Sequence, residues 1–225
     1  MEKKVDTLIR ESLREAATLL LWKSGAIRIN LEKPFQLVSG NFSPIYVNCR
    51  QVISDPVIMG LFTAAARLIV SREAIPVDML AGGVTAGVPF AAYLAQALNL
   101  PLVYVRKAVK GYGIANQVEG GTPQGKRVLL VEDLITDAGS KINFIEALRD
   151  ADAMVQDVLV LYDRLQGGAA ALKNLGIRLH ALTDMDSALV SGEQAGLFPS
   201  EAFRSVREYL SDPKKWHEER GLEFS

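Results

Sequence analysis

The chain has 225 residues, of which 49% are hydrophobic and 23% charged, and its formal net charge is -1. This composition is typical of one globular domain with a sizeable core, and the balanced charge disfavours a nucleic-acid binder that depends on phosphate contacts. No apolar run approaches the roughly 20 residues of a membrane helix, and the acid-containing N-terminus differs from a signal peptide, so we expect a cytoplasmic protein. Cys49 is the only cysteine, which excludes an internal disulfide and a cysteine-cluster metal site.

The first quarter of the chain predicts a helix followed by a β-rich segment. Residues 5–22 place apolar side chains, among them Leu8 and Ile9, at helical spacing on one face. Residues 26–48 contain a glycine, two prolines and short β-type runs, which predicts a hairpin-like hood. Asp55 before Pro56 is a start signal for a helix over residues 56–70.

From residue 77 onward, predicted strands and helices alternate, and two C-terminal helices follow. This alternation predicts an α/β fold with a mostly parallel, right-handed central sheet flanked by helices. We expect one domain over residues 1–225, made of an N-terminal helix and hood (1–54), a core (55–190) and C-terminal helices (191–225). The predicted strands are 77–81, 102–105, 128–131, 153–162 and 177–182, and the predicted helices are 85–98, 141–151, 168–174, 200–209 and 213–220.

The most informative segment is 128–140, which reads VLLVEDLITDAGS. Its four apolar residues indicate a strand buried on both faces, and Glu132 and Asp133 follow at the carboxyl end, where α/β sheets bind ligands. Two carboxylates can accept hydrogen bonds from the hydroxyls of a ribose. The small-residue turn of Thr136, Gly139 and Ser140 opens a helix and suits a phosphate. The segment therefore predicts a ribose 5-phosphate site, against the alternative of a strand end with solvated acids.

Two further segments favour anion binding. Residues 81–87, AGGVTAG, link a strand to a helix and predict either a second phosphate turn or tight helix–strand packing. Residues 106–125 predict a long loop that begins with Arg106, Lys107 and Lys110, either a lid of cations over a departing anion or a solvated basic loop. Two anion sites at one sheet edge imply a substrate with two separated phosphate groups.

Two other patterns carry no function in our interpretation. Residues 120–126 match G-x-x-x-x-G-K, but Arg127 replaces the required Ser or Thr and the segment precedes a strand. His180 and His217 are isolated in the sequence, and we expect His180 to be a core or edge residue.

Segment 128–140 resembles the phosphoribosyl-pyrophosphate signature of the type I phosphoribosyltransferases. Three more segments resemble the orotate-specific members of that family: 35–46 their base-binding segment, 105–113 their catalytic loop, and 163–168 the segment after the strand that follows the signature. The resemblance spans roughly residues 5 to 190 in the expected order.

This resemblance implies transfer of the phosphoribosyl group from phosphoribosyl pyrophosphate to orotate, giving orotidine 5-monophosphate and pyrophosphate in pyrimidine (UMP) biosynthesis. It implies Mg²⁺ held mainly by substrate and water, without a direct protein ligand. It also implies a homodimer in which the loop of one subunit reaches the other's site, with no nucleic-acid or membrane partner. The implied catalytic residues are Lys110 and Asp133. The residues implied for phosphoribosyl pyrophosphate are Arg106, Lys107, Lys110, Tyr112, Glu132, Asp133, Thr136, Asp137, Ala138, Gly139 and Ser140, and those for orotate are Ser39, Phe42, Ser43, Tyr46, Thr136 and Arg164.

The chain departs from the family pattern at four positions. Asp137 and Ala138 occupy the first two places of a Thr-Gly-Gly run, and we predict that Asp137 points away from the phosphate and caps the next helix. Tyr112 replaces a frequent histidine, and Val38 replaces a lysine found in some relatives. Two alternatives remain open: a transferase for another base, and a non-catalytic regulator that binds phosphoribosyl pyrophosphate.

Overall fold

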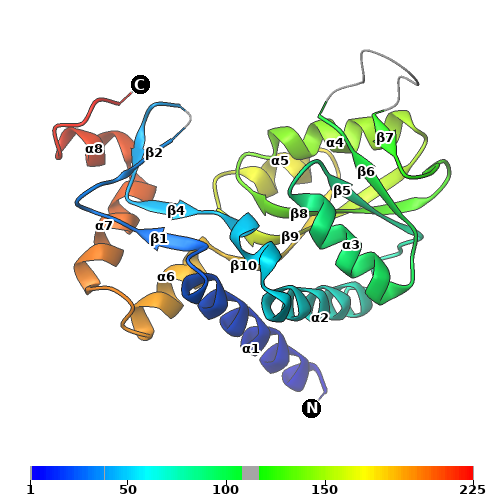
Figure 1. The fold of residues 1–225 in the computed structure, drawn as a ribbon, viewed down its shortest axis with the longest axis horizontal. Helices are drawn as coiled ribbons and strands as arrows, with labels where there is room; N and C mark the ends of the chain where they lie inside the picture. Colours follow the sequence, from blue (N-terminus) through cyan, green and yellow to red (C-terminus); the bar gives the residue numbers. More distant parts are fainter. Residues whose placement is uncertain (1, 38, 108–116, 225) are drawn as a thin grey trace.

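The computed structural model describes residues 2–37, 39–107 and 117–224. Its N-terminal part is a long helix and a small β-rich hood, as expected (Figure 1). The two-stranded sheets of the hood pair β1 with β4 and β2 with β3, all antiparallel. The elements are α1 (Glu2–Lys23), β1 (Ile27–Ile29), β2 (Phe35–Gln36), β3 (Phe42–Ser43), β4 (Ile45–Val47) and the 3₁₀ helix η1 (Cys49–Ser54).

The core is a six-stranded sheet with the order β10-β9-β8-β5-β6-β7. The first five strands in that order run parallel, and only β7, at the edge, pairs antiparallel with β6. The mostly parallel α/β fold is therefore confirmed. Its strands are β5 (Met79–Gly83), β6 (Leu102–Val105), β7 (Val118–Glu119), β8 (Arg127–Ile135), β9 (Met154–Asp163) and β10 (Arg178–Asp184).

Helices cover both faces of the sheet (Figure 1). On one face, α4 and α5 bury side chains such as Phe144 and Leu172 against β8 and β9. On the other face, α1, α2 and α3 form a core that continues into the hood and the C-terminal helices. Among the described residues, no helix is both long and apolar enough to span a membrane. The helices are α2 (Pro56–Arg72), α3 (Gly87–Leu98), α4 (Gly139–Asp150), α5 (Gly168–Asn174), α6 (Met185–Gln194), α7 (Ser200–Ser211) and α8 (Pro213–Glu218).

Local start signals explain several of these helices. The Asp55 carboxylate accepts hydrogen bonds from the backbone N–H groups of Val57 and Ile58, so it caps α2 as expected. In the same way, Asp184 accepts from the N–H of Ser187 and caps α6. The sequence analysis missed α6, and the predicted boundary between residues 190 and 191 falls inside it.

The structure corrects four other expectations. Leu8 and Ile9 lie on α1 but are exposed, and the buried apolar side chains that the structure describes on that helix begin at Ala17. The predicted loop over 106–125 contains β7, because Val118 and Glu119 pair with Val105 and Tyr104. Helix α3 begins at Gly87 instead of residue 85. Strand β8 continues through the two acids to Ile135 instead of ending before them.

Candidate active site

The two acids of β8 lie within the strand, near its carboxyl end, and both are buried. Glu132 is 4% exposed and Asp133 is 6% exposed. Successive strand residues point to opposite faces of a sheet, so the two carboxylates lie in different surroundings. The interpretation of solvated acids at a strand end is therefore wrong, because buried carboxylates need partners.

Glu132 faces α4 and the turn after β5. Its Oε2 lies 3.0 Å from Nζ of Lys141, and its Oε1 is buried without a hydrogen-bond partner among the described residues. A Cβ atom at Gly83 or Gly87 would collide with that carboxylate, so these glycines leave the space that it occupies. Burial raises the pKa of Glu132 to about 7, although Lys141 and the Gly83 N–H act to lower it. The acid thus titrates near neutral pH.

Asp133 lies on the side of Cys49, the first residue of η1. Burial raises the pKa of the Cys49 thiol well above its ordinary value; Asp133 adds to the rise, whereas Arg164 and Lys141 oppose it. All three charged groups therefore lie within electrostatic range of the buried thiol. Cys49 is fully buried, as expected for a small apolar residue.

Arg164 belongs to the segment after β9, which lies beside the predicted phosphate turn. The N–H of Arg164 donates to the Ile135 carbonyl (3.0 Å), and the N–H of Gly168 donates to the Thr136 carbonyl (2.9 Å). The Arg164 side chain is partly exposed, but its Nε is buried and has no hydrogen-bond partner among the described residues. A buried guanidinium donor without a partner indicates a place for an anionic ligand.

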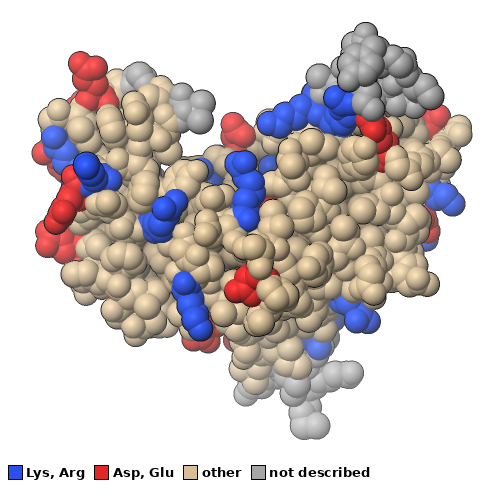
Figure 2. All heavy atoms as spheres, viewed as in Figure 1, with Lys and Arg blue, Asp and Glu red and all other residues tan. Residues whose placement is uncertain are grey.

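A cavity of about 320 Å³ brings the predicted groups together at the carboxyl edge of the sheet. Both β8 acids line it, and so do Thr136 and Ser140 of the first turn and three residues of the second turn, 84–86. The two predicted anion-binding turns therefore share one cavity. Figure 2 shows the molecule hollowed between the hood with the C-terminal helices on one side and the sheet on the other, with Lys and Arg side chains on both sides of the hollow.

The glycines of the second turn also serve packing. Gly82 and Gly83 belong to β5, and a Cβ at Gly82 would lie 2.7 Å from the Val88 Cα atom of α3. Both interpretations of residues 81–87 therefore have support. The glycines allow close contact with a helix, and residues 84–86 line the cavity.

Asp137 bonds to the helix that follows it. Its Oδ1 accepts a hydrogen bond of 3.1 Å from the N–H of Gly139, the first residue of α4. Between them, Ala138 is buried and left-handed, with φ 73°. The carboxylate is therefore held at the start of α4, but the N-cap position itself is Ala138, one residue after the predicted capping residue.

The two described cationic residues after β6 have different surroundings. Lys107 lines the cavity, whereas Arg106 pairs with Glu119 of β7 at 3.3 Å. The structure thus places Lys107, but not the Arg106 guanidinium, at the predicted site. The predicted catalytic Lys110 and the departures Tyr112 and Val38 lie outside the described residues.

The hood residues predicted to frame orotate are not among those lining the cavity. Ser39 is exposed, and the buried Ser43 hydroxyl donates to the Ile45 carbonyl at 2.7 Å. Tyr46 stacks near Phe35, with ring centroids 5.5 Å apart, and Arg28 lies over both rings. The side chain of Phe42 is partly exposed.

The C-terminal helix α8 holds this hood through His217. That imidazole is fully buried; its Nε2 accepts from the Phe42 N–H at 2.9 Å, and its Nδ1 lies 2.6 Å from the Pro213 carbonyl. A carbonyl only accepts, so Nδ1 carries the proton and the ring is neutral. His180, by contrast, is a buried partner of Asp157, with Nε2 2.8 Å from Oδ1, which agrees with its predicted core role.

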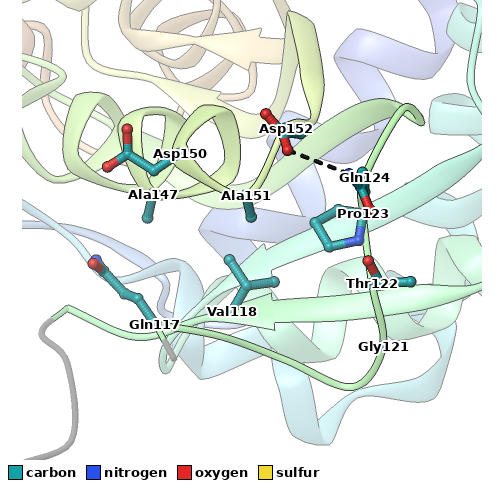
Figure 3. Close-up of a pocket in the computed structure, with 10 residues that line it drawn as sticks. All are labelled: Gln117, Val118, Gly121, Thr122, Pro123, Gln124, Ala147, Asp150, Ala151 and Asp152. Carbon is teal, nitrogen blue, oxygen red and sulfur yellow. Dashed lines mark hydrogen bonds between the residues drawn. The ribbon is translucent and has the colours of Figure 1, made fainter. Parts of the chain in front are cut away.

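A larger cavity, of about 470 Å³, lies at the other end of α4 and between Val118 of β7 and residues 121–124 (Figure 3). Asp150 and Asp152 contribute carboxylates, but Gln124 donates to Asp152 across its rim. The predicted sugar site is near the start of α4, so size alone does not locate the chemistry.

Two charged residues that line the site cavity were not predicted from the sequence, Arg50 and Lys141. Arg50 comes from η1, which follows the hood, so only the fold reveals its proximity to β8. Lys141 stands directly after Ser140, and a cation in the first turn of a helix is an unfavourable choice that could have signalled a nearby acid.

Comparisons with known proteins agree with this geometry. A family profile described as "Phosphoribosyl transferase domain" matches residues 58–175. The chain is 38% identical over 213 residues to an orotate phosphoribosyltransferase of Sinorhizobium medicae, covering 93% of this chain and 92% of that protein. It is 41% identical over 212 residues to one from Dinoroseobacter shibae, covering 92% and 93%.

Solved structures show the same likeness. The orotate phosphoribosyltransferase of Aeropyrum pernix superimposes with a TM-score of 0.69 and 32% identity, over 81% of this chain and 99% of that one. The Leishmania donovani UMP synthase gives a TM-score of 0.76 and 28% identity over 88% of this chain and 42% of that longer one. Because close relatives match nearly the whole length and the signature acids line the expected cavity, the chain belongs to the orotate phosphoribosyltransferase family.

Proposed function

We propose that the chain transfers the phosphoribosyl group of phosphoribosyl pyrophosphate to orotate, forming orotidine 5-monophosphate and pyrophosphate in pyrimidine biosynthesis. The observation that carries this proposal is the single cavity that combines the two β8 acids with both anion-binding turns. Membership of the orotate phosphoribosyltransferase family supports the choice of orotate over other bases.

The cavity contains groups that could bind both the hydroxyls and the phosphate of a ribose 5-phosphate. The Glu132 and Asp133 carboxylates would accept hydrogen bonds from the ribose hydroxyls. The turn 136–140 would hold the 5-phosphate through its hydroxyls and through the backbone N–H groups at the start of α4. The second turn, 84–86, and Lys107 would face the pyrophosphate end of the substrate.

Arg164 would bind the acceptor base. Two observations support this role: its Nε is buried without a partner among the described residues, and its backbone N–H donates to Ile135 of β8. Orotate carries a carboxylate, which a planar guanidinium can bind through two parallel hydrogen bonds. This pairing would discriminate orotate from uracil, because uracil leaves the donor without a partner.

The reaction breaks the bond between the anomeric carbon and the pyrophosphate oxygen and forms a bond from that carbon to a ring nitrogen of orotate. Positive charge develops on the sugar, where Asp133 would stabilise it, and negative charge develops on the pyrophosphate. The resemblance assigns Lys110 and Tyr112 to the second charge. Lys107, which lines the cavity, would also stabilise the negative charge on the pyrophosphate.

Magnesium fits this site as a companion of the substrate. The part of the chain that the structure describes contains no group of three or more His, Cys, Asp or Glu side chains that could cage the ion. Mg²⁺ usually keeps several waters and binds substrate phosphates, so the diphosphate and water would hold it. The bound ion would offset the negative charge of the departing pyrophosphate.

We also propose that the protein acts in the cytoplasm as a homodimer with shared active sites. The homodimer rests on the resemblance of residues 105–113 to a loop that serves the neighbouring subunit. The cytoplasmic location rests on the composition, which is typical of a globular protein.

A turnover assay tests the function. The purified chain, phosphoribosyl pyrophosphate and magnesium are incubated with orotate, uracil, adenine or hypoxanthine, and pyrophosphate release is measured. We expect release with orotate and little with the other bases. Release with another base in place of orotate would point to a different transferase, and binding of the sugar phosphate without any release would point to a non-catalytic regulator.

A further inference from the structure

Lys141 is a buried cation in the wall of the sugar-phosphate cavity. It is 8% exposed, its Nζ lies 3.0 Å from Glu132 Oε2, and the same atom lies 3.3 Å from the Ser140 hydroxyl. It thus links the acid that would hold the ribose to the turn that would hold the phosphate.

This position destabilises a charged lysine unless a nearby acidic group offsets its charge. The first turn of α4 presents the positive end of the helix dipole, which repels a cation. Burial also disfavours the charged form of an amine. The compensating group is Glu132, whose own charge is disfavoured by burial. Each ion therefore depends on the other.

We propose that Lys141 is a positioning residue of the sugar site, whose ammonium group holds the Glu132 carboxylate ready to accept a hydrogen bond from a ribose hydroxyl. The inference rests on the proposed function and adds a residue to its sugar site. Oε1 of Glu132 is buried beside Gly83 and Gly87 without a hydrogen-bond partner among the described residues. Oε2 bonds to the lysine and, with its second lone pair, would accept the hydrogen bond from the ribose hydroxyl.

The charges around Glu132 determine the effect of removing the lysine. Asp133 raises the pKa of Glu132, whereas Lys141 and the Gly83 N–H lower it. Arg50 and Lys107 are the other charged residues that line the cavity. Without Lys141, the desolvated carboxyl keeps its proton to a higher pH, and a protonated carboxyl is a weaker acceptor for a hydroxyl. Sugar-phosphate binding would then need a more alkaline solution.

The alternative is an ion pair that only stabilises the fold. Replacing Lys141 by methionine keeps the length and apolar stem of the side chain but removes the charge. A purely structural pair would change thermal stability in this variant and leave the pH dependence of ligand binding unaltered.

The experiment measures phosphoribosyl pyrophosphate binding by calorimetry, with magnesium, from about pH 6 to about pH 9. It compares wild type, Lys141→Met, Lys141→Arg and, as the matched control, Lys173→Met on the exposed end of α5. The second ionisation of a phosphate, near pH 6, contributes equally to every protein. Differences between variants therefore report on the protein.

We expect Lys141→Met to bind at least about tenfold more weakly at pH 7 and to recover toward pH 9, with its binding midpoint shifted to higher pH. Lys141→Arg should stay close to wild type, because it restores the cation. An unchanged midpoint in folded Lys141→Met would overturn the inference even if wild type turns over orotate, whereas absent orotate turnover by wild type contradicts the proposed function instead.

A second variant covers the case in which Lys141→Met does not fold. Glu132→Gln keeps an acceptor oxygen and a partner for the lysine but cannot titrate. We expect that its affinity for phosphoribosyl pyrophosphate will not show the change near pH 7 that wild type shows. If wild type shows no such change relative to Glu132→Gln, the positioning role of the Lys141–Glu132 pair is wrong.

Discussion

Glu132 and Asp133 are neighbours in the chain, but each serves the cavity from a different environment. Glu132 is paired with Lys141 and has a pKa of about 7. Asp133 lies toward Cys49 and, with Lys141 and Arg164, influences that buried thiol. Strand geometry causes this divergence, because consecutive side chains point to opposite faces. A ribose at the strand end would meet one acid from each face.

Arg164 is proposed to bind the carboxylate of orotate through its planar guanidinium group. Arg164→Lys keeps the positive charge but loses the planar fork that can bind a carboxylate through two bonds. We expect the KM for orotate to rise at least about tenfold while the KM for phosphoribosyl pyrophosphate changes little. Steady-state kinetics with each substrate varied in turn measures this. Equal changes in both KM values would show that Arg164 does not belong to the base site.

The residue chemistry of the sugar site could largely be predicted from segment 128–140, because acids and a small-residue turn share one strand end there. The first-turn position of Lys141 signals a nearby acid, but its pairing with Glu132 could not be predicted, since it depends on the side chain of Glu132 turning toward α4. Arg106 was predicted at the cavity but pairs with Glu119. That ion pair exists because β7 returns beside β6, and a two-residue strand has too few residues for a recognisable pattern.

At the scale of elements, α8 connects the C-terminus to the hood. Figure 1 shows α8 beside the β2–β3 hairpin, and His217 supplies the acceptor for the Phe42 N–H. Trp216 is 1% exposed and packs edge-to-face against Tyr209 of α7, which anchors α8 to the rest of the molecule. The hood that is proposed to frame the base is therefore held in place from the far end of the chain.

Loss of this acceptor should loosen the hood. His217→Phe keeps a planar ring but leaves the Phe42 N–H unpaired, so we expect the free energy of unfolding to fall by about 2 kcal/mol in urea titrations. His217→Gln is the matched control, because its amide oxygen can reach the position of Nε2. The KM for orotate should rise more in the Phe variant than in the Gln variant. Identical stability of the two variants would contradict the role of the acceptor.

Element boundaries show where sequence patterns stop being informative. The predicted strand over 128–131 ends at the first acid, since charged residues usually leave a core. In the structure β8 continues to Ile135, because Glu132 and Leu134 still pair with Val160 and Tyr162 of β9. The α6 helix was not predicted, although Asp184 caps it.

At the scale of the whole molecule, the hollow between the hood and the sheet is a meeting point of distant segments. Arg50 from η1, Lys107 after β6 and Lys141 from α4 all line the site cavity. The net charge of -1 does not reveal that these cations lie close together. Such a cluster suits a substrate that carries two phosphate groups. Their convergence depends on tertiary contacts between the hood, η1 and the sheet, so composition and spacing alone could not predict it.

The proposed sharing of active sites between two subunits can be tested by mixing inactive variants. Lys110→Ala removes a cation of the loop, and Asp133→Asn alters the sugar site; each variant alone should lose most orotate turnover. If the loop acts in the partner's site, a mixed dimer contains one site with an intact loop and an intact sugar site. Denaturing and refolding the two together should therefore restore about a quarter of wild-type activity, because about half of the dimers are mixed and each has one intact site. Mixing Lys110→Ala with wild type serves as the control for refolding. If the mixture of inactive variants stays inactive while the control recovers, the loop acts within its own subunit and the shared-site proposal is wrong.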